Sequence, residues 1–240
     1  NRSFGYFKLS LDLSGNSLYG FSKLTGSSSI KILGVDYSQY FKADVDFRRY
    51  FNFKRGRFII TRLNIGAGYA YGNSTVMPYI KQFFLGGANS MRAWRARSLG
   101  PGSYYDPYLF DSERIIDQTA DFKFESNIEG RFNFSRMVKG ALFVDAGNIW
   151  SLKGNDFRED AELKSNISGL WNDLAVAGGF GLRFDFSFFV IRLDLGLKLK
   201  DPALVKHLDN YQIQADGQYP DQAFVGWKPF NVNFAIGYPF

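Results

Sequence analysis

The stretch QFFLGGANSMRAWRARSLGPGSYY, residues 82–105, does not read as an ordinary surface loop. It turns on a pair of glycines and then alternates three arginines with apolar side chains before a Gly-Pro-Gly segment. Arginine among apolar residues indicates a loop that packs against another part of the protein, where each guanidinium needs a carboxylate partner. The sequence on either side of the loop should supply those carboxylates.

Outside this loop, apolar and polar residues alternate with a period of two, which predicts β-strands. The clearest example is 120–134, where phenylalanines and Ile128 share one face while Lys123, Glu125, Glu129 and Arg131 share the other. The same alternation predicts strands at 6–13, 40–53, 58–71, 138–150, 174–186, 188–200 and 230–240, and the run 78–85 reads as a further strand that leads into the loop. The total is about nine strands.

The strand pattern predicts an all-β fold, an antiparallel transmembrane β-barrel. Full charges occur in the middle of strands, the apolar faces are uniformly large, and short turns alternate with long polar connections at 14–38, 157–172 and 201–229. Such a barrel has an apolar band towards lipid, a polar lumen and short turns at one end. A soluble all-β protein could show the same alternation and is the alternative.

The predicted strand number does not close a barrel. Single-chain bacterial barrels have an even number of strands, and an open sheet edge cannot face lipid. We therefore expect either a different strand count or further strands before Asn1, where the chain starts abruptly on the approach to a strand and without a signal peptide.

Composition narrows the class of protein further. The chain has 240 residues with 26 Phe, 14 Tyr and no Cys, which excludes a disulfide scaffold and thiolate metal sites. Aromatic residues are abundant although the mean hydropathy is −0.20, and no apolar run reaches the roughly 18 residues of a transmembrane helix. The net charge of +6 comes from basic residues interleaved with acidic ones, which argues against a nucleic-acid partner.

Two carboxylates are the best partners for a loop arginine. Glu129 and Asp145 lie on the polar phase of adjacent predicted strands joined by a short turn, and Phe143 shares the phase of Asp145. A planar guanidinium fits between two carboxylates and packs well on an aromatic ring. The alternative is that each charge lines a wet lumen and pairs without specificity.

The same residues resemble a known family. Gly86-Gly87, then Met91-Arg92-Ala93-Trp94, then Leu99-Gly100-Pro101 is similar to the sixth-loop signature of the BamA/TamA superfamily: a Gly-Gly pair, Val-Arg-Gly-Phe and Ile-Gly-Pro. Arg92 falls on the arginine of that signature, whereas Met91, Ala93 and Trp94 depart from its valine, glycine and phenylalanine. The segment FVDAGNIW at 143–150 resembles the family's strand after that loop, and Glu129 matches the glutamate of the preceding strand.

The resemblance implies a loop, residues 82–119, folded into the lumen with Arg92 held by Glu129 and Asp145 near Phe143. The sequences of the loop and of the segment ending at Trp150 are most similar to the TamL-type branch found in Bacteroidetes. It implies that residues 1–240 form the C-terminal part of a barrel of about sixteen strands, without the first strands and the periplasmic POTRA domains. The end of the chain resembles the β-signal of outer-membrane barrels, with Phe234, Ile236, Gly237, Tyr238 and Phe240.

The implied function is that of an outer-membrane assembly factor. A protein of this family is integral to the bacterial outer membrane and inserts other proteins by strand templating at a lateral gate. Its expected partners are outer-membrane lipids, unfolded outer-membrane proteins and a periplasmic partner, TamB-like or another assembly component. A secretion pore of the same superfamily, of the two-partner type, and an autonomous small surface barrel or adhesin remain alternatives.

The sequence offers no catalytic constellation. The single histidine, His207, lies two positions from Asp209 in a polar stretch and has no predicted nucleophile beside it. The glycines of the loop are not followed by the Gly-Lys-Ser/Thr of a phosphate-binding loop. We therefore expect no enzymatic activity, no metal site and no cofactor.

Overall fold

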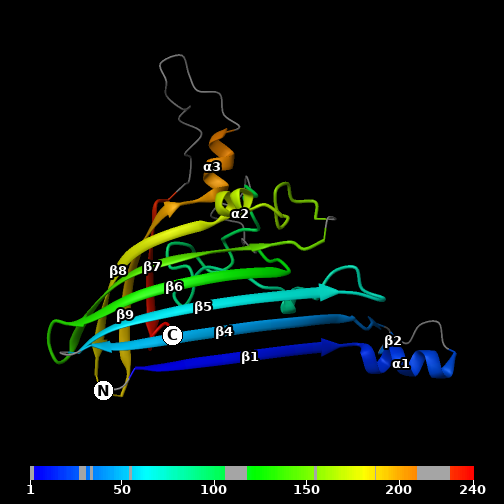
Figure 1. The fold of residues 1–240 in the computed structure, drawn as a ribbon, viewed down its shortest axis with the longest axis horizontal. Coiled ribbons are helices and arrows are strands. Elements are labelled where there is room, and N and C mark those ends of the chain that lie inside the picture. The colour runs from blue at the N-terminus through cyan, green and yellow to red at the C-terminus, as the bar shows by residue number, and fades with distance from the viewer. Residues whose placement is uncertain are drawn as a thin grey trace, which may run out of the picture.

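Eight strands form one antiparallel sheet in the computed structural model, in the order β1-β4-β5-β6-β7-β8-β9-β10 (Figure 1). The structure describes residues 3–26, 31–32, 35–53, 56–105, 118–153, 156–186, 188–209 and 228–240. The strands of the sheet are β1 (Phe4–Ser14), β4 (Tyr40–Phe53), β5 (Arg57–Ala70), β6 (Phe122–Asn133), β7 (Val138–Trp150), β8 (Ala175–Asp185), β9 (Val190–Lys200) and β10 (Phe230–Ile236).

The connections follow the expected alternation. Tight turns join β4 to β5, β6 to β7 and β8 to β9, and they lie at one end of the sheet (Figure 1). The long connections lie at the other end and carry the short elements: α1 (Asn16–Thr25), β2 (Lys31–Ile32), β3 (Val35–Asp36), η1 (Tyr79–Lys81), α2 (Ile167–Asp173) and α3 (Pro202–Asp209). In outer-membrane barrels the long loops face outwards from the cell.

The burial pattern is inverted relative to a water-soluble sheet. On β1 the alternate leucines Leu9, Leu11 and Leu13 are more than half exposed. The charged side chains of Glu129 and Asp145, in contrast, have no exposed surface. A sheet that exposes leucine on one face and encloses charge on the other suits a lipid exterior and a polar lumen. We call the enclosed face the lumen face; Glu125, Glu129 and Asp145 lie on it as their predicted phases require.

No helix in the described ranges is both long enough and apolar enough to span a membrane.

The strand count of about nine was wrong. The sheet has eight strands, because the run 78–85 is not a strand: Pro78 precedes the short helix η1, and only an isolated bridge between Phe83 and Ala120 follows. The last strand also ends earlier than predicted, at Ile236 rather than at Phe240. The next residue, Gly237, has a φ of 87° and leaves the extended conformation. Helices α1, α2 and α3 occupy connections that were expected to be loops.

The two edges of the sheet, β1 and β10, are not paired with each other in the described residues. The sheet is strongly curved (Figure 1). Eight antiparallel strands that curve around a polar face without closing confirm the predicted fold class, part of a transmembrane β-barrel.

Candidate functional site

The described part of the loop between β5 and β6, residues 82–105 and 118–119, lies on the lumen face and is the candidate site; we call it the lumen loop. Phe83 and Ala120 exchange two backbone hydrogen bonds, of 2.8 and 3.0 Å, so the loop leaves and rejoins the sheet at one point. Within the loop, the amide of Arg97 donates to the carbonyl of Leu85 at 2.9 Å. Residues 106–117 lie outside the described part of the loop.

Gly86 and Gly87 make the turn that starts the loop. Both have positive φ angles, 101° and 91°, a conformation that L side chains rarely adopt. A Cβ on Gly86 would lie 2.0 Å from the carbonyl oxygen of Arg95. The glycine pair is therefore required for the path of the loop that carries Arg92.

Arg92 is fully enclosed between two strands of the barrel wall. Its Nε and Nη2 donate to the two oxygens of Asp145 on β7, at 2.9 and 2.7 Å, and its backbone amide donates to the same carboxylate at 3.1 Å. Its Nη1 is paired with Glu129 on β6. None of these three side chains has exposed surface. The arrangement is a two-carboxylate clamp on one planar guanidinium.

Phe143 completes the clamp. The guanidinium carbon of Arg92 lies 3.5 Å from the centroid of the Phe143 ring. The ring has room because Gly179 stands opposite on β8; a Cβ there would lie 2.4 Å from the ring. Stacking on the ring restricts the guanidinium to the plane in which it meets both carboxylates.

The two carboxylates differ in what else holds them. Glu129 also pairs with Arg131, at 2.6 Å, and with Arg183, at 3.4 Å. Asp145 is otherwise bound by neutral donors, the amide group of Asn127 at 2.9 Å and the backbone of Arg92. Asp145 therefore depends on Arg92 for charge neutralisation, whereas Glu129 does not.

Arg92 remains charged in this environment. Burial by itself lowers the pKa of Arg92, but the hydrogen bonds to Asp145 and the charges of Asp145 and Glu129 outweigh it and raise that pKa above its ordinary value. Arg92 therefore brings a full positive charge to the two carboxylates.

The backbone of Arg92 reaches across to the other side of the sheet. Its carbonyl oxygen accepts hydrogen bonds from Asn231, at 3.1 Å, and Asn233, at 2.7 Å, both on β10. Gly196 on β9 permits this approach, since a Cβ there would lie 2.7 Å from the amide nitrogen of Ala93. In a flat sheet, β6 and β10 would be about 19 Å apart, so the sheet must curve around the loop for one residue to touch both.

A second arginine holds the loop from the wall. Nη2 of Arg192 on β9 donates to the carbonyl of Ala88, at 2.8 Å, and to the side chain of Asn89, at 2.7 Å. Arg62 of β5 donates from Nη1 to the carbonyl of Asn89 in the loop, at 3.4 Å, and the same nitrogen pairs with Glu125 of β6 at 2.9 Å. The lumen loop is thus bound by side chains from β5, β6, β7, β9 and β10.

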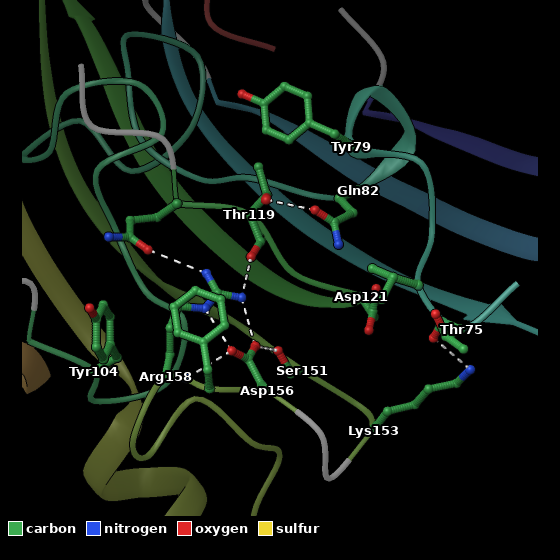
Figure 2. A pocket seen from close by; sticks show the side chains of 13 residues that line it. Thr75, Tyr79, Gln82, Tyr104, Thr119, Asp121, Ser151, Lys153, Asp156 and Arg158 are labelled. Atoms are coloured by element: carbon green, nitrogen blue, oxygen red, sulfur yellow. Dashed lines mark hydrogen bonds and ion pairs between the residues drawn. The ribbon is translucent and has the colours of Figure 1, made fainter.

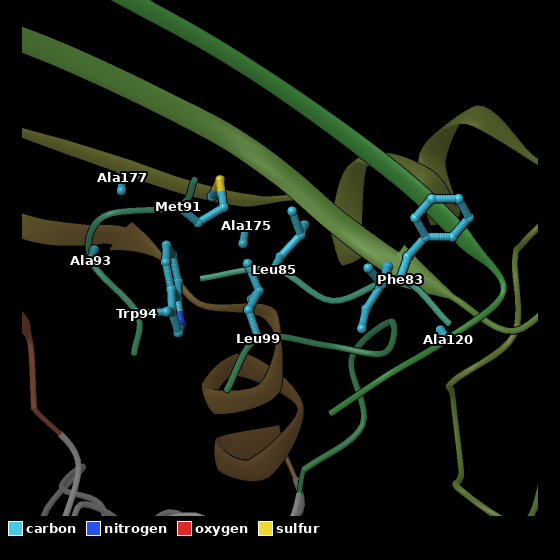
Figure 3. Close-up of a cluster of buried hydrophobic side chains, with 10 residues drawn as sticks. Phe83, Leu85, Met91, Ala93, Trp94, Leu99, Ala120, Ala175 and Ala177 are labelled. Atoms are coloured by element: carbon cyan, nitrogen blue, oxygen red, sulfur yellow. The ribbon is translucent and has the colours of Figure 1, made fainter. Parts of the chain in front are cut away.

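Apolar residues of the loop form a small core with the barrel wall (Figure 3). Met91, Ala93 and Trp94 lie near Ala175 and Ala177 of β8, whose small side chains leave space for them (Figure 3). Arg92 thus meets charge, while the apolar residues beside it meet alanine. The expectation of a carboxylate partner is confirmed for Arg92; Arg95 is instead exposed, and the guanidinium carbon of Arg97 lies 4.3 Å from the centroid of the Phe84 ring.

The Gly-Pro-Gly segment docks on the end of β7, beyond its pairing with β8. The amide of Gly102 donates to the carbonyl of Ile149 at 2.8 Å, and Asn148 donates to the carbonyl of Gly102 at 2.7 Å. A Cβ on Gly100, which has a φ of 78°, would lie 2.4 Å from the side chain of Asn148. The peptide bond between Gly100 and Pro101 is cis.

The residues expected to form the β-signal do not share one exposed face. Phe234 and Ile236 point outwards, 68% and 72% exposed, but the chain leaves the sheet at Gly237. The ring of Tyr238 then stacks on Arg131, with its centroid 4.4 Å from the guanidinium carbon. Phe240 is buried, and the centroid of its ring lies 5.7 Å from the guanidinium carbon of Arg92. The last residues therefore turn towards the lumen loop.

A polar pocket of about 520 Å³ lies beside the loop, towards the long connections (Figure 2). Two of its basic side chains are engaged: Arg158 pairs with Asp156 at 2.7 Å, and Lys153 donates to the carbonyl of Thr75 at 3.0 Å (Figure 2). Across the described residues, no group of three or more His, Asp or Glu side chains could hold a metal ion.

Sequence reasoning identified the clamp residues but not their supports. Arg183, Arg192 and Asp194 are fully buried around the clamp, and Asn231 and Asn233 hold its backbone. In the sequence these residues are polar positions on the lumen phase of their strands. The strand glycines Gly179, Gly181 and Gly196 could have pointed to them, because a position without a side chain leaves space for a close contact.

Two comparisons place this geometry among known proteins. The chain is 24% identical over 152 residues to the outer membrane protein assembly factor BamA of Neisseria meningitidis serogroup B, a match that covers 62% of this chain and 19% of that protein. Its fold is similar to the crystal structure of BamA from Haemophilus ducreyi lacking POTRA domains 1–3, with a TM-score of 0.53 and 16% identity over 82% of this chain and 35% of that one. The chain thus spans well under half the length of either relative.

The family model of the Omp85 superfamily domain matches residues 11–240, nearly the whole chain. Together with the curved antiparallel sheet and its lipid-type exterior, the match identifies the class of protein: the chain belongs to the Omp85 superfamily of integral outer-membrane β-barrel proteins.

Proposed function

We propose that this protein helps to fold and insert other proteins into the outer membrane, as a non-enzymatic assembly factor. Membership of the Omp85 superfamily and the similarity to BamA, an assembly factor by name, support a role in assembly. Because its loop sequence resembles the TamL-type branch, the protein would belong to that branch and act with a periplasmic TamB-like partner on unfolded outer-membrane proteins.

The observation that carries the proposal is the form of β10. This edge strand has seven residues, fewer than the roughly 9–11 that cross a bilayer. Its outer N–H and C=O groups are a template for an incoming strand. A short strand also favours local thinning of the bilayer, which lowers the cost of insertion. The gate would lie beside β10, and the lumen loop would hold that strand from inside through Asn231 and Asn233.

An autonomous small barrel is a poorer account of the same sheet. It requires β1 to pair with β10 within this chain, and in the described residues these two strands are the unpaired edges of the sheet.

The test is an insertion assay with the full-length protein in phospholipid vesicles. An unfolded outer-membrane protein is added, and the fraction that becomes folded, seen as a heat-modifiable band, is followed with time. We expect faster folding than in protein-free vesicles, and loss of the acceleration when Asn231 and Asn233 are both replaced by alanine. Equal rates with and without the protein, combined with a stable ion conductance, would instead support the secretion-pore alternative.

A further inference from the structure

An apolar groove on the exterior of the barrel lies between α2 and the ends of β6 and β7. It has a volume of about 350 Å³, and every side chain that lines it is apolar. It lies outside the lumen and shares no residue with the clamp, so the role of the lumen loop does not account for it.

The strand wall of the groove belongs to the lipid-facing side of the sheet. Phe122 and Phe124 share the outward phase with Ile128, which is 51% exposed, while Glu125 on the opposite phase is buried. Trp150 is the cross-strand partner of Phe122, with ring centroids 5.9 Å apart. The groove is therefore continuous with the surface that contacts lipid.

The other wall is one stripe of α2. Ile167, Leu170 and Trp171 stand at helical spacing on one side of α2, and they line the groove together with Leu174, the residue directly after the helix. Ile167 is 86% and Trp171 61% exposed, so the stripe continues outwards past the groove. The amine of Lys200 lies 5.0 Å from the centroid of the Trp171 ring. Tryptophan and lysine together are typical of the boundary between hydrocarbon and headgroups.

Polar groups beside the groove have partners elsewhere. The indole N–H of Trp150 faces the carboxylate of Asp173 at 3.4 Å, and the side chain of Lys164 pairs with the same carboxylate at 2.9 Å. The groove therefore presents hydrocarbon alone. At the boundary of the membrane, on the exterior of a barrel, the neighbouring molecules that match an apolar surface are lipid chains.

We propose that this groove binds one acyl chain of an outer-leaflet lipid, with α2 lying over the chain at the membrane boundary. The chain would be held more tightly than the lipids that slide past the open faces of the strands, because it is enclosed on two sides. The proposal concerns the exterior of the barrel and does not depend on the assembly function.

The experiment uses the full-length protein in bilayers that contain a phosphatidylcholine with a photoactivatable diazirine in its acyl chain. After illumination, labelled residues are mapped by mass spectrometry. We expect label on Trp150 and Leu170, in excess of label on the open lipid-facing residue Leu142. Trp150 is decisive because it is only 2% exposed, so that a lipid reaches it only through the groove.

Two matched variants separate the groove from ordinary lipid contact. Leu170→Trp fills the groove with apolar volume and is expected to abolish the label on Trp150, while Leu142→Trp, on the open outer face, leaves it unchanged. Label spread evenly over the outer face, or no label on Trp150 in the unmodified protein, would overturn the proposal. That second result needs no variant, so a folding failure of Leu170→Trp leaves the test intact.

Discussion

Arg92 is held through its side chain, its amide and its carbonyl. Its side chain is clamped by two carboxylates and an aromatic ring, its amide donates to one of those carboxylates, and its carbonyl is held by two asparagines. A buried ion pair adds little stability over an apolar pair, but removal of one partner is costly because a buried charge is left behind. The value of the clamp is therefore that it fixes one position of the loop.

Replacement of Arg92 by alanine should destabilise the protein by about 3–5 kcal/mol, since Asp145 keeps only neutral donors. The matched control is Arg95→Ala, in the same loop, whose side chain is exposed; a surface substitution of this kind changes stability by roughly 0.5 kcal/mol or less. The measurement is the urea midpoint of unfolding in micelles. Similar midpoints for the two variants would mean that the clamp does not hold the loop.

Gly196→Ala tests the close approach of the loop to β9. The added methyl group would meet the backbone of Arg92 and Ala93 at 2.7–2.8 Å, and we expect a loss of roughly 1–3 kcal/mol from the strain. Gly130→Ala is the control, because that strand glycine has nothing within 4 Å of its Cβ position. If both variants unfold at the same urea concentration, the loop does not lie against β9.

At the scale of elements, the lumen loop joins the two ends of a run of five strands. It binds β6 and β7 through the side chain of Arg92 and β10 through its carbonyl. β10 is the shortest strand of the sheet and pairs on one side only, with β9. The contact with the loop therefore adds to the pairing with β9 in holding β10 in place.

Replacement of Asn231 and Asn233 by alanine should therefore loosen β10 selectively. We expect faster hydrogen exchange in residues 230–236 of the double variant, with β6 and β7 unchanged, because local opening depends on local contacts. Val232→Ala, on the outer face of the same strand, controls for altered side-chain size. Unchanged exchange in β10 of the double variant would show that the loop does not support this strand.

At the scale of the whole molecule, charge is inside and hydrocarbon outside. Enclosed ion pairs are screened by salt much less than exposed ones. The stability difference between the wild type and Arg92→Ala should therefore be nearly the same at about 0.1 M and about 1 M NaCl. A difference that shrinks strongly at high salt would place Arg92 in contact with bulk water.

Much of this architecture could be predicted from the alternation of residue types. The phase of each strand predicted which side chains face the lumen, and it selected Glu129 and Asp145 before their distances were known. The end of β10 could not be predicted this way, because Tyr238 and Phe240 continue the alternation although Gly237 turns the chain inwards.

The supports of the clamp were harder to predict than the clamp itself. Arg192, Asn231 and Asn233 look like any other lumen residues in the sequence, and only the curvature of the sheet brings them to the loop. Helix α2 was missed because it has only seven residues, so that its apolar spacing spans about two turns within a polar connection.

The most direct test of the clamp is a double-mutant cycle of Arg92→Ala and Asp145→Asn, read as free energies of unfolding in micelles. If Asp145 depends on Arg92, the double variant should be more stable than the sum of the single effects by about 2–3 kcal/mol, because removal of both partners leaves no unpaired charge. Additivity within about 0.5 kcal/mol would show that the two residues do not interact and that the lumen loop is not held where the structure places it.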